Sequence, residues 1–144
     1  MMMRNVVAVV TGVLVVLLVV FALQWLGSLL YPLPEGLDPM DPAQREQVTE
    51  YMRGLPVSSW LLTFASELLG AFLGALVTGR MAGSRRAPLA GLIVLLAVVG
   101  SVTNWMAFPH PTLFVVGQLV GYPLVFLAAR RMLTAQSPEA AATA

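Results

Sequence analysis

Residues 66–75 read Ser-Glu-Leu-Leu-Gly-Ala-Phe-Leu-Gly-Ala, and they place one carboxylate, Glu67, in the middle of a long apolar run. The run extends from Val57 to Gly79, which at about 1.5 Å per residue is enough for a helix to cross a hydrocarbon core of roughly 30 Å. No other apolar run of this length carries a charge so deep in its interior. The stretch therefore predicts a membrane-spanning helix, around which we interpret the rest of the chain.

The composition of the whole chain also indicates a membrane protein. Of its 144 residues, 58% are hydrophobic and 10% are charged, whereas a soluble domain has about 25% charged residues. So little charge cannot cover a surface in contact with water. The absence of cysteine excludes disulfides, thiolate metal sites and cysteine nucleophiles. The net charge is +1 and the sequence has no basic tract, so no nucleic acid is expected as a partner. The expected partner is the lipid bilayer.

Three further apolar runs have the length of membrane spans, and the last of the four is expected to be the shortest. Backbone hydrogen bonds must close within a segment that lies in lipid, so helix is predicted even where valine is abundant. The first run is longer than the roughly 7–15 residues of a signal-peptide apolar region, which predicts a retained span. We expect an all-α transmembrane four-helix bundle, with spans at about 5–30, 57–79, 89–108 and 112–129 of a single domain, 1–133.

Residues 31–56 form the only long polar connection, and five of the seven acidic residues lie in it. Asp41 is a predicted N-cap, and Gln44 stands at the capping-box position. A short helix is expected over 43–53, with its apolar stripe against the membrane surface or the mouth of the bundle. At the other end of the chain, residues 134–144 predict a flexible cytoplasmic tail.

The placement of arginine predicts the orientation of the chain. In a four-span arrangement, six of the eight arginines fall on one side of the membrane, and the positive-inside rule makes that side cytoplasmic for both termini. The 31–56 connection is then extracytoplasmic. Aromatic residues near the opposite end of the spans predict the same four-span arrangement, since tryptophan and tyrosine favour the membrane–water interface. The six arginines are Arg4, Arg80, Arg85, Arg86, Arg130 and Arg131, and the aromatic residues are Trp25, Tyr31, Trp60, Trp105 and Phe108.

The second span has a face of small residues and a face of large ones. Small residues allow helix backbones to approach closely in lipid, so the small face, which includes Glu67, should point inward. The large arc, predicted to face lipid, contains Leu68, Leu69, Phe72, Leu73 and Leu76. The glycines expected to pack between helices are Gly70, Gly74, Gly100, Gly117 and Gly121. The alternative to packing within the bundle is that the same small-residue faces contact a second copy of the chain or another membrane protein.

The strongly polar residues of the spans all fall in the predicted outer half. We expect them to form one intramembrane polar cluster: Glu67, Gln24, Asn104, Gln118 and His110. A carboxylate at the bilayer centre costs about 2.5–3.5 kcal/mol on insertion scales. Such a residue is either a proton or cation site, or a neutral glutamate that ties the second span to its neighbours through hydrogen bonds.

His110 lies between Pro109 and Pro111 and is therefore rigidly placed. It is either a pH-sensitive or capping residue of the polar cluster or an ordinary turn histidine at the interface. A metal site that joins His110 to the acidic loop has little support, since no ligand spacing is recognisable. We predict no metal and no cofactor. The chain has no nucleophile elbow and no second histidine, so an enzyme is not favoured.

Three segments together resemble a group of small, uncharacterised four-span bacterial membrane proteins. They are residues 31–39 (Tyr-Pro-Leu-Pro-Glu-Gly-Leu-Asp-Pro), Glu67 followed by Gly70 and Gly74, and Asn104 followed by Pro109-His110-Pro111. The resemblance covers most of the chain apart from its two tails. It implies the plasma membrane of a bacterium and the same four-span plan, and it implies no activity.

The function expected from the sequence is that of a non-enzymatic structural or accessory membrane component with an outward-facing polar pocket. The alternative is a small proton- or cation-linked transporter or channel component gated by Glu67. Transporters often contain an internal repeat, and the two halves of this chain show none, because a long acidic loop joins the first pair of spans and a tight turn joins the second. A membrane enzyme that uses Glu67 and His110 as acid and base ranks third.

Overall fold

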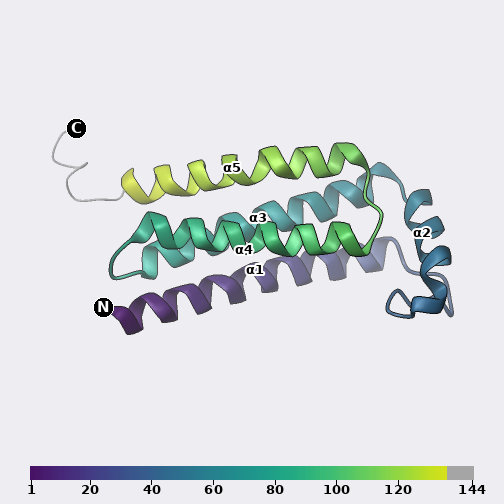
Figure 1. The fold of residues 1–144 in the computed structure, drawn as a ribbon, viewed down its shortest axis with the longest axis horizontal. Coiled ribbons are helices and arrows are strands. Elements are labelled where there is room, and N and C mark those ends of the chain that lie inside the picture. The colour runs from purple at the N-terminus through teal and green to yellow at the C-terminus, as the bar shows by residue number, and fades with distance from the viewer. Residues whose placement is uncertain (136–144) are drawn as a thin grey trace.

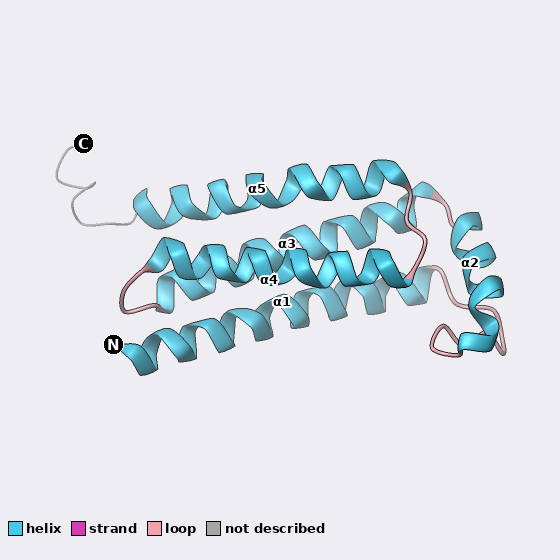
Figure 2. Ribbon diagram, viewed as in Figure 1, coloured by secondary structure: helices cyan, strands magenta, loops and turns pink. Residues whose placement is uncertain are grey.

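The computed structural model describes residues 1–135, and over these residues the chain is entirely helical apart from its loops (Figures 1 and 2). Four long helices lie side by side: α1 (Met2–Leu30), α3 (Val57–Met81), α4 (Arg86–Ala107) and α5 (Thr112–Ala135). Each is long and apolar enough to cross a membrane. The predicted all-α four-helix bundle is thus confirmed. Its N-terminus and the described end of α5 lie at the same end of the bundle.

The helix ends differ from the predicted spans by a few residues. α4 begins at Arg86, because Pro88 is tolerated in the first turn of a helix. α5 continues past the two arginines of its last turns to Ala135 and has 24 residues, against 22 for α4. The prediction that the fourth span is the shortest is therefore wrong. Thr134 and Ala135, assigned to the tail, belong to α5, and the remainder of the predicted tail lies outside the described residues.

α3 is the central helix of the bundle. It packs against α1, α4 and α5, whereas α1 makes few contacts with α4 and none with α5 among the described residues. Since α3 has neighbours on three sides, most of its circumference is covered. Leu76, predicted to face lipid, is only 4% exposed and belongs to the hydrophobic core, against which Leu68 and Phe72 also pack. The lipid-facing prediction is wrong for these residues.

The contact between α1 and α3 depends on glycine. A Cβ atom on Gly12 would lie 1.8 Å from Thr78 Oγ1 and 2.9 Å from the carbonyl oxygen of Gly74, and a Cβ on Gly74 would lie 2.7 Å from the carbonyl oxygen of Gly12. The two backbones are therefore in direct contact. Thr78 Oγ1 also donates a hydrogen bond of 3.1 Å to the carbonyl of Ala8 across the same contact.

The other glycines predicted to pack between helices behave differently from one another. Gly70 approaches the α1 backbone at Val16, while a Cβ on Gly117 or Gly121 would meet side chains of α3. Gly100 has no atom within 4 Å of the place where its Cβ would lie, and it is exposed. Gly100 therefore packs against no helix, in contrast to the prediction, because α1 stays clear of α4 at this level.

A short helix, α2 (Arg45–Gly54), lies across the end of the bundle opposite the N-terminus (Figure 1). A 3-10 turn, η1 (Pro42–Gln44), precedes it, and the side chain of Asp41 caps that turn by accepting from the backbone of Ala43. The predicted N-cap and the short helix are thus confirmed. Val48 of α2 is buried, which shows that the apolar stripe of this helix covers the mouth of the bundle.

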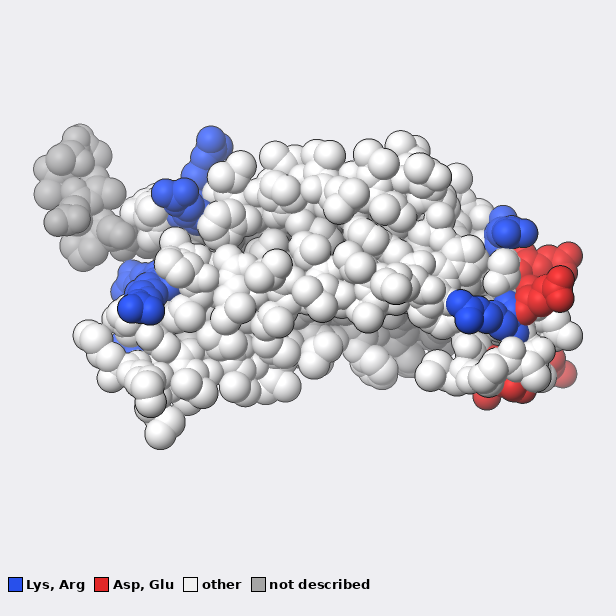
Figure 3. Space-filling model, in the orientation of Figure 1, with Lys and Arg blue, Asp and Glu red and all other residues white. Residues whose placement is uncertain are grey.

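Charge is separated along the molecule. Figure 3 shows arginines at the end that carries the N-terminus, and all the visible acidic side chains at the α2 end, beside further blue side chains. The long surface between the two ends is free of charge in this view, as the hydrocarbon core of a bilayer requires. The one acidic residue that the sequence places between the ends, Glu67, is buried.

Candidate functional site

The candidate site is built around Glu67, which the middle of α3 places inside the bundle with 8% of its surface exposed. Two helices face it. α4 contributes Ser101, and α5 contributes Gln118 and Tyr122, which lie four residues apart and so share one face of their helix. All three side chains are buried. The site therefore exists because the central helix directs its carboxylate between two neighbours.

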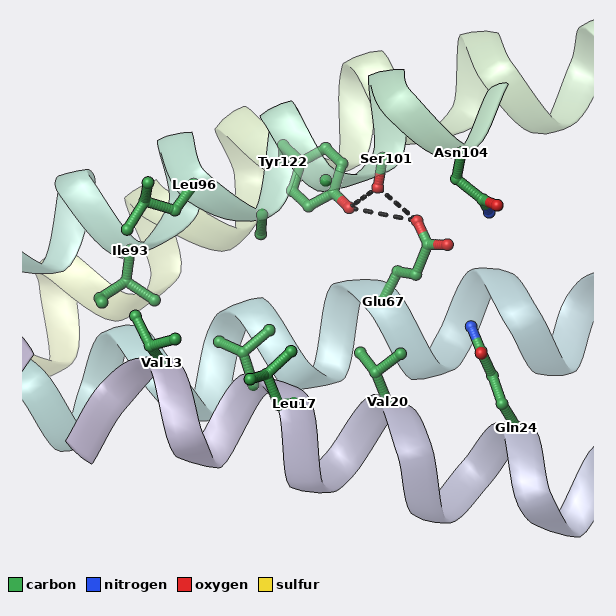
Figure 4. Close-up of a pocket in the computed structure, with 13 residues that line it drawn as sticks. Val13, Leu17, Val20, Gln24, Glu67, Ile93, Leu96, Ser101, Asn104 and Tyr122 are labelled. Atoms are coloured by element: carbon green, nitrogen blue, oxygen red, sulfur yellow. Dashed lines mark hydrogen bonds between the residues drawn. The ribbon is translucent and has the colours of Figure 1, made fainter. Parts of the chain in front are cut away.

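The hydrogen bonds of the carboxylate converge on one oxygen, Oε2. Gln118 Nε2 donates to it at 2.6 Å, Ser101 Oγ donates to it, and Tyr122 OH approaches it at 3.4 Å. Tyr122 OH also bonds to Ser101 Oγ at 2.5 Å. Figure 4 shows the triangle that joins Glu67, Ser101 and Tyr122, with the second oxygen of Glu67 turned away from it toward the side where Asn104 and Gln24 lie.

The network extends one step further, to the indole of Trp105. Trp105 Nε1 donates at 2.9 Å to Gln118 Oε1, so the amide of Gln118 accepts from α4 and donates to α3. Within residues 1–135, no buried side-chain nitrogen or oxygen is left without a hydrogen bond. The network therefore links α3, α4 and α5 and leaves none of its fully buried polar atoms unpaired.

No cation neutralises Glu67 within the part of the chain that the structure describes. The carboxylate has hydrogen-bond donors as its partners, and the arginines lie at the two ends of the molecule. Gln118 and Ser101 each donate one proton to Oε2, while the single proton of Tyr122 is shared between Ser101 at 2.5 Å and the carboxylate at 3.4 Å. The site is therefore a carboxyl group held by hydrogen bonds alone, with no cationic partner among residues 1–135.

His110 and Asn104 form a second, separate polar pair. His110 Nδ1 lies 2.9 Å from the carbonyl of Phe108, and His110 Nε2 lies 3.4 Å from Asn104 Nδ2. In this arrangement Nδ1 donates to the carbonyl and Nε2 accepts from the amide, because the carbonyl can only accept and the amide nitrogen can only donate. The imidazole also packs against the rings of Trp60 and Phe114. His110 is thereby held in the turn and takes no part in the Glu67 network.

Four of the five residues of the predicted cluster thus form two separate pairs, and Gln24 belongs to neither. Glu67 bonds directly to Gln118, and Asn104 bonds to His110. Gln24 is exposed on α1 and lines a cavity. The sequence interpretation missed Ser101, Tyr122 and Trp105. Helical spacing contained a signal for the first two, because Ser101 precedes Asn104 by three residues and Tyr122 follows Gln118 by four.

A cavity of about 330 Å³ adjoins Glu67 between α1 and α4 (Figure 4). Its walls are one face of each of these helices, at spacings of three and four residues, and Glu67 and Tyr122 form its floor. The lining is mainly aliphatic. From α1 it includes Val13, Val16, Leu17, Val20 and Gln24, and from α4 it includes Ile93, Leu96, Ala97, Gly100, Ser101 and Asn104.

A second cavity, of about 290 Å³, lies at the α2 end of the bundle. It is lined by α1, α2, α3 and the turn that contains His110, and residues of the 31–56 connection close it. Gln24 and Asn104 line this cavity as well as the first. These two amides therefore stand between the mouth of the bundle and the Glu67 cavity.

No group of three or more histidine, aspartate or glutamate side chains is close enough together to hold a metal ion in residues 1–135. Comparison with known protein families, with curated proteins and with solved structures finds no match. The function must therefore be argued from the Glu67 network and its cavity.

Proposed function

We propose that the chain is a non-enzymatic accessory or structural component of a membrane, in which the Glu67 network holds three helices around a pocket with a polar floor. The observation that carries the proposal is the single oxygen of Glu67 that accepts from Ser101 of α4 and from Gln118 of α5. A buried network that joins three helices through hydrogen bonds to one carboxylate oxygen favours one arrangement of those helices. His110, the other acid–base group of the membrane region, bonds to Asn104 instead.

The location and the orientation are part of this proposal. The excess of arginine at the end that carries the N-terminus and the described end of α5 supports a cytoplasmic position for that end, by the positive-inside rule. α2 and the second cavity then face outward, and the pocket is reached from outside past Gln24 and Asn104. Residues 31–39 and the Glu67 and His110 segments resemble those of small four-span bacterial membrane proteins. This resemblance supports the plasma membrane of a bacterium as the location of the chain.

The test of the structural role compares Glu67→Gln with Glu67→Leu. Gln keeps the shape of the side chain and one acceptor oxygen, whereas Leu leaves buried donors on α4 and α5 unbonded, at about 1–3 kcal/mol for each. We expect Glu67→Gln to unfold near the wild-type midpoint and Glu67→Leu to unfold much earlier in reversible denaturation in mixed micelles. Equal stability of Glu67→Leu and wild type would remove the structural role.

A second candidate function is supported by one observation, the cavity that reaches Glu67. It is a proton- or cation-linked transport component in which Glu67 is the protonatable gate. The purified protein in liposomes should then carry a proton or alkali-cation current that Glu67→Gln abolishes while the fold is retained. A current of the same size in empty liposomes, wild type and Glu67→Gln would reject this candidate.

A further inference from the structure

We propose that the Glu67 cavity binds a small amphiphilic ammonium ion, that is, one protonated amine on an aliphatic chain. The inference rests on the proposed function insofar as it uses the Glu67 network to place the carboxylate beside the cavity. The inference adds the chemical class of the ligand, which the proposed structural role does not specify.

The charge of the site supplies the first reason. Glu67 has only hydrogen-bond donors around one of its oxygens and no cationic partner in residues 1–135. An ionised Glu67 without a partner would be costly in a medium of low polarity, and a ligand of opposite charge removes much of that cost. An anion would be repelled by the ionised form, and a neutral molecule would leave its charge uncompensated.

The walls of the cavity supply the second reason. Apart from Glu67, its lining contains no charged residue, and most of the lining consists of aliphatic side chains of α1 and α4. The volume of about 330 Å³ is at the small end of the range for ligand sites, roughly 300–1,000 Å³. These features suit an aliphatic chain of modest length and exclude a hydrophilic cation with a complete hydration shell.

The polar groups are placed to receive an amine. Figure 4 shows Gln24 of α1 and Asn104 of α4 on either side of the opening beside Glu67, with the aliphatic side chains farther along both helices. An ammonium group has three donors and no acceptor. The free side of the Glu67 carboxylate and the two amide oxygens are acceptors of the kind such a group needs. The ligand would thus lie with its amine at Glu67 and its chain toward Val13 and Ile93.

The route of entry also suits a molecule that dissolves in the membrane. The cavity is open between α1 and α4, two helices that make few contacts with each other. Leu17 and Leu96 line it and are 59% and 46% exposed, so they stand at its lipid side. An amphiphilic amine gathers in the bilayer and can enter from there, as an aqueous ion cannot.

The binding test uses octylammonium, with 1-octanol and octanoate as matched neutral and anionic compounds. The protein is held in nanodiscs of zwitterionic phosphatidylcholine, which avoids attraction of the amine to anionic lipid. Trp25→Phe and Trp60→Phe leave Trp105, which bonds to Gln118, as the fluorescent reporter. Octylammonium should change this fluorescence saturably, with an affinity about tenfold or more above that of octanol, since a hydrogen bond to a charged group adds that much.

Two variants locate the site. Glu67→Gln should lower the affinity for octylammonium to that of octanol, because it removes the charge and keeps the shape. Gly100→Leu should abolish binding of both compounds, since Gly100 lines the cavity and its side chain would meet open space. Val99→Leu on the exposed face of α4 is the control that should bind normally.

The outcomes separate this inference from the proposed function. Equal affinity for octylammonium and octanol, unchanged by Glu67→Gln, would mean that the cavity takes an uncharged chain such as a lipid acyl group, and would overturn the inference. Full binding by Gly100→Leu would overturn it as well. If octylammonium binds as expected but Glu67→Leu is as stable as wild type, the ammonium site stands and the structural role of Glu67 fails.

Discussion

α3 is held to its neighbours in two different ways. On the side of α1 the contact is made by backbone against backbone at Gly12 and Gly74, with one hydrogen bond from Thr78. On the side of α4 and α5 it is made by a buried carboxylate and the side chains that donate to it. The difference shows that a membrane bundle can be fixed by close approach on one face and by hydrogen bonds on another, since apolar burial alone drives little association in lipid.

The same comparison explains where the cavity lies. The polar network fixes α4 and α5 on α3, and the glycine contact fixes α1 on α3, whereas α1 makes few contacts with α4. Gly74 and Gly100 are the same residue type with opposite consequences, since one lies against a helix backbone and the other lines open space. The gap beside Glu67 thus lies between α1 and α4, because the glycine contact and the polar network each fix helices to α3 and not α1 to α4.

The largest effect is expected for Gly12→Leu, which tests the glycine contact. The new side chain would overlap Thr78 and the α3 backbone, and overpacking of this kind costs about 1–3 kcal/mol or more. Reversible unfolding in mixed micelles should show α1 detached or the fold lost. Gly100→Leu is the matched control and should unfold as wild type does. Equal losses in the two variants would show that the two glycines are equivalent and would break the comparison.

A smaller effect is expected for Gln118→Leu, which tests the polar contact. This change leaves Trp105 Nε1 without its acceptor and removes one donor to Glu67, so the free energy of unfolding should fall by about 1–3 kcal/mol. Circular dichroism in the same denaturation assay measures it. Val120→Leu, at an exposed position of the same helix, should change little. A loss no greater than that of the control would show that the network is dispensable.

The smallest effect is expected for Thr78→Val, which keeps the shape of the side chain and removes its hydrogen bond to Ala8 across α1 and α3. Interhelical hydrogen bonds in membranes contribute on average about 0.6 kcal/mol, so the glycine contact should survive. Thr103→Val is the control, because Thr103 bonds only within its own helix. A loss as large as that of Gly12→Leu would assign the α1 contact to the hydrogen bond and not to the glycines.

The sequence alone predicts the four spans and one hydrogen-bonded contact of the site. Apolar length and arginine placement predict four helices with both termini at one end, because the bilayer demands long uncharged segments. The capping residue Asp41 is recognisable because its chemistry is local. The pairing of Glu67 with Gln118 was among the predicted alternatives, because strongly polar residues in lipid must find one another.

The rest depends on how the helices are arranged, which a helical wheel does not contain. The wheel predicts one inner face for α3, whereas the central position of α3 also covers Leu76. Ser101 and Tyr122 are ordinary residues in apolar helices, and only the position of α4 and α5 around Glu67 makes them partners. Gly100 has the pattern of a packing residue, and the distance of α1 from α4 leaves it free.

The most direct test of the account is the reactivity of a cysteine placed at Gly100, in a chain that has no cysteine of its own. Gly100→Cys should react with a cationic methanethiosulfonate faster than with an anionic one by roughly tenfold or more, because the carboxylate attracts the cation. Glu67→Gln should remove the preference, and Val99→Cys in lipid should react slowly with both. A Gly100→Cys thiol that reacts equally with the two reagents, or no faster than Val99→Cys, would contradict a negatively charged cavity between α1 and α4.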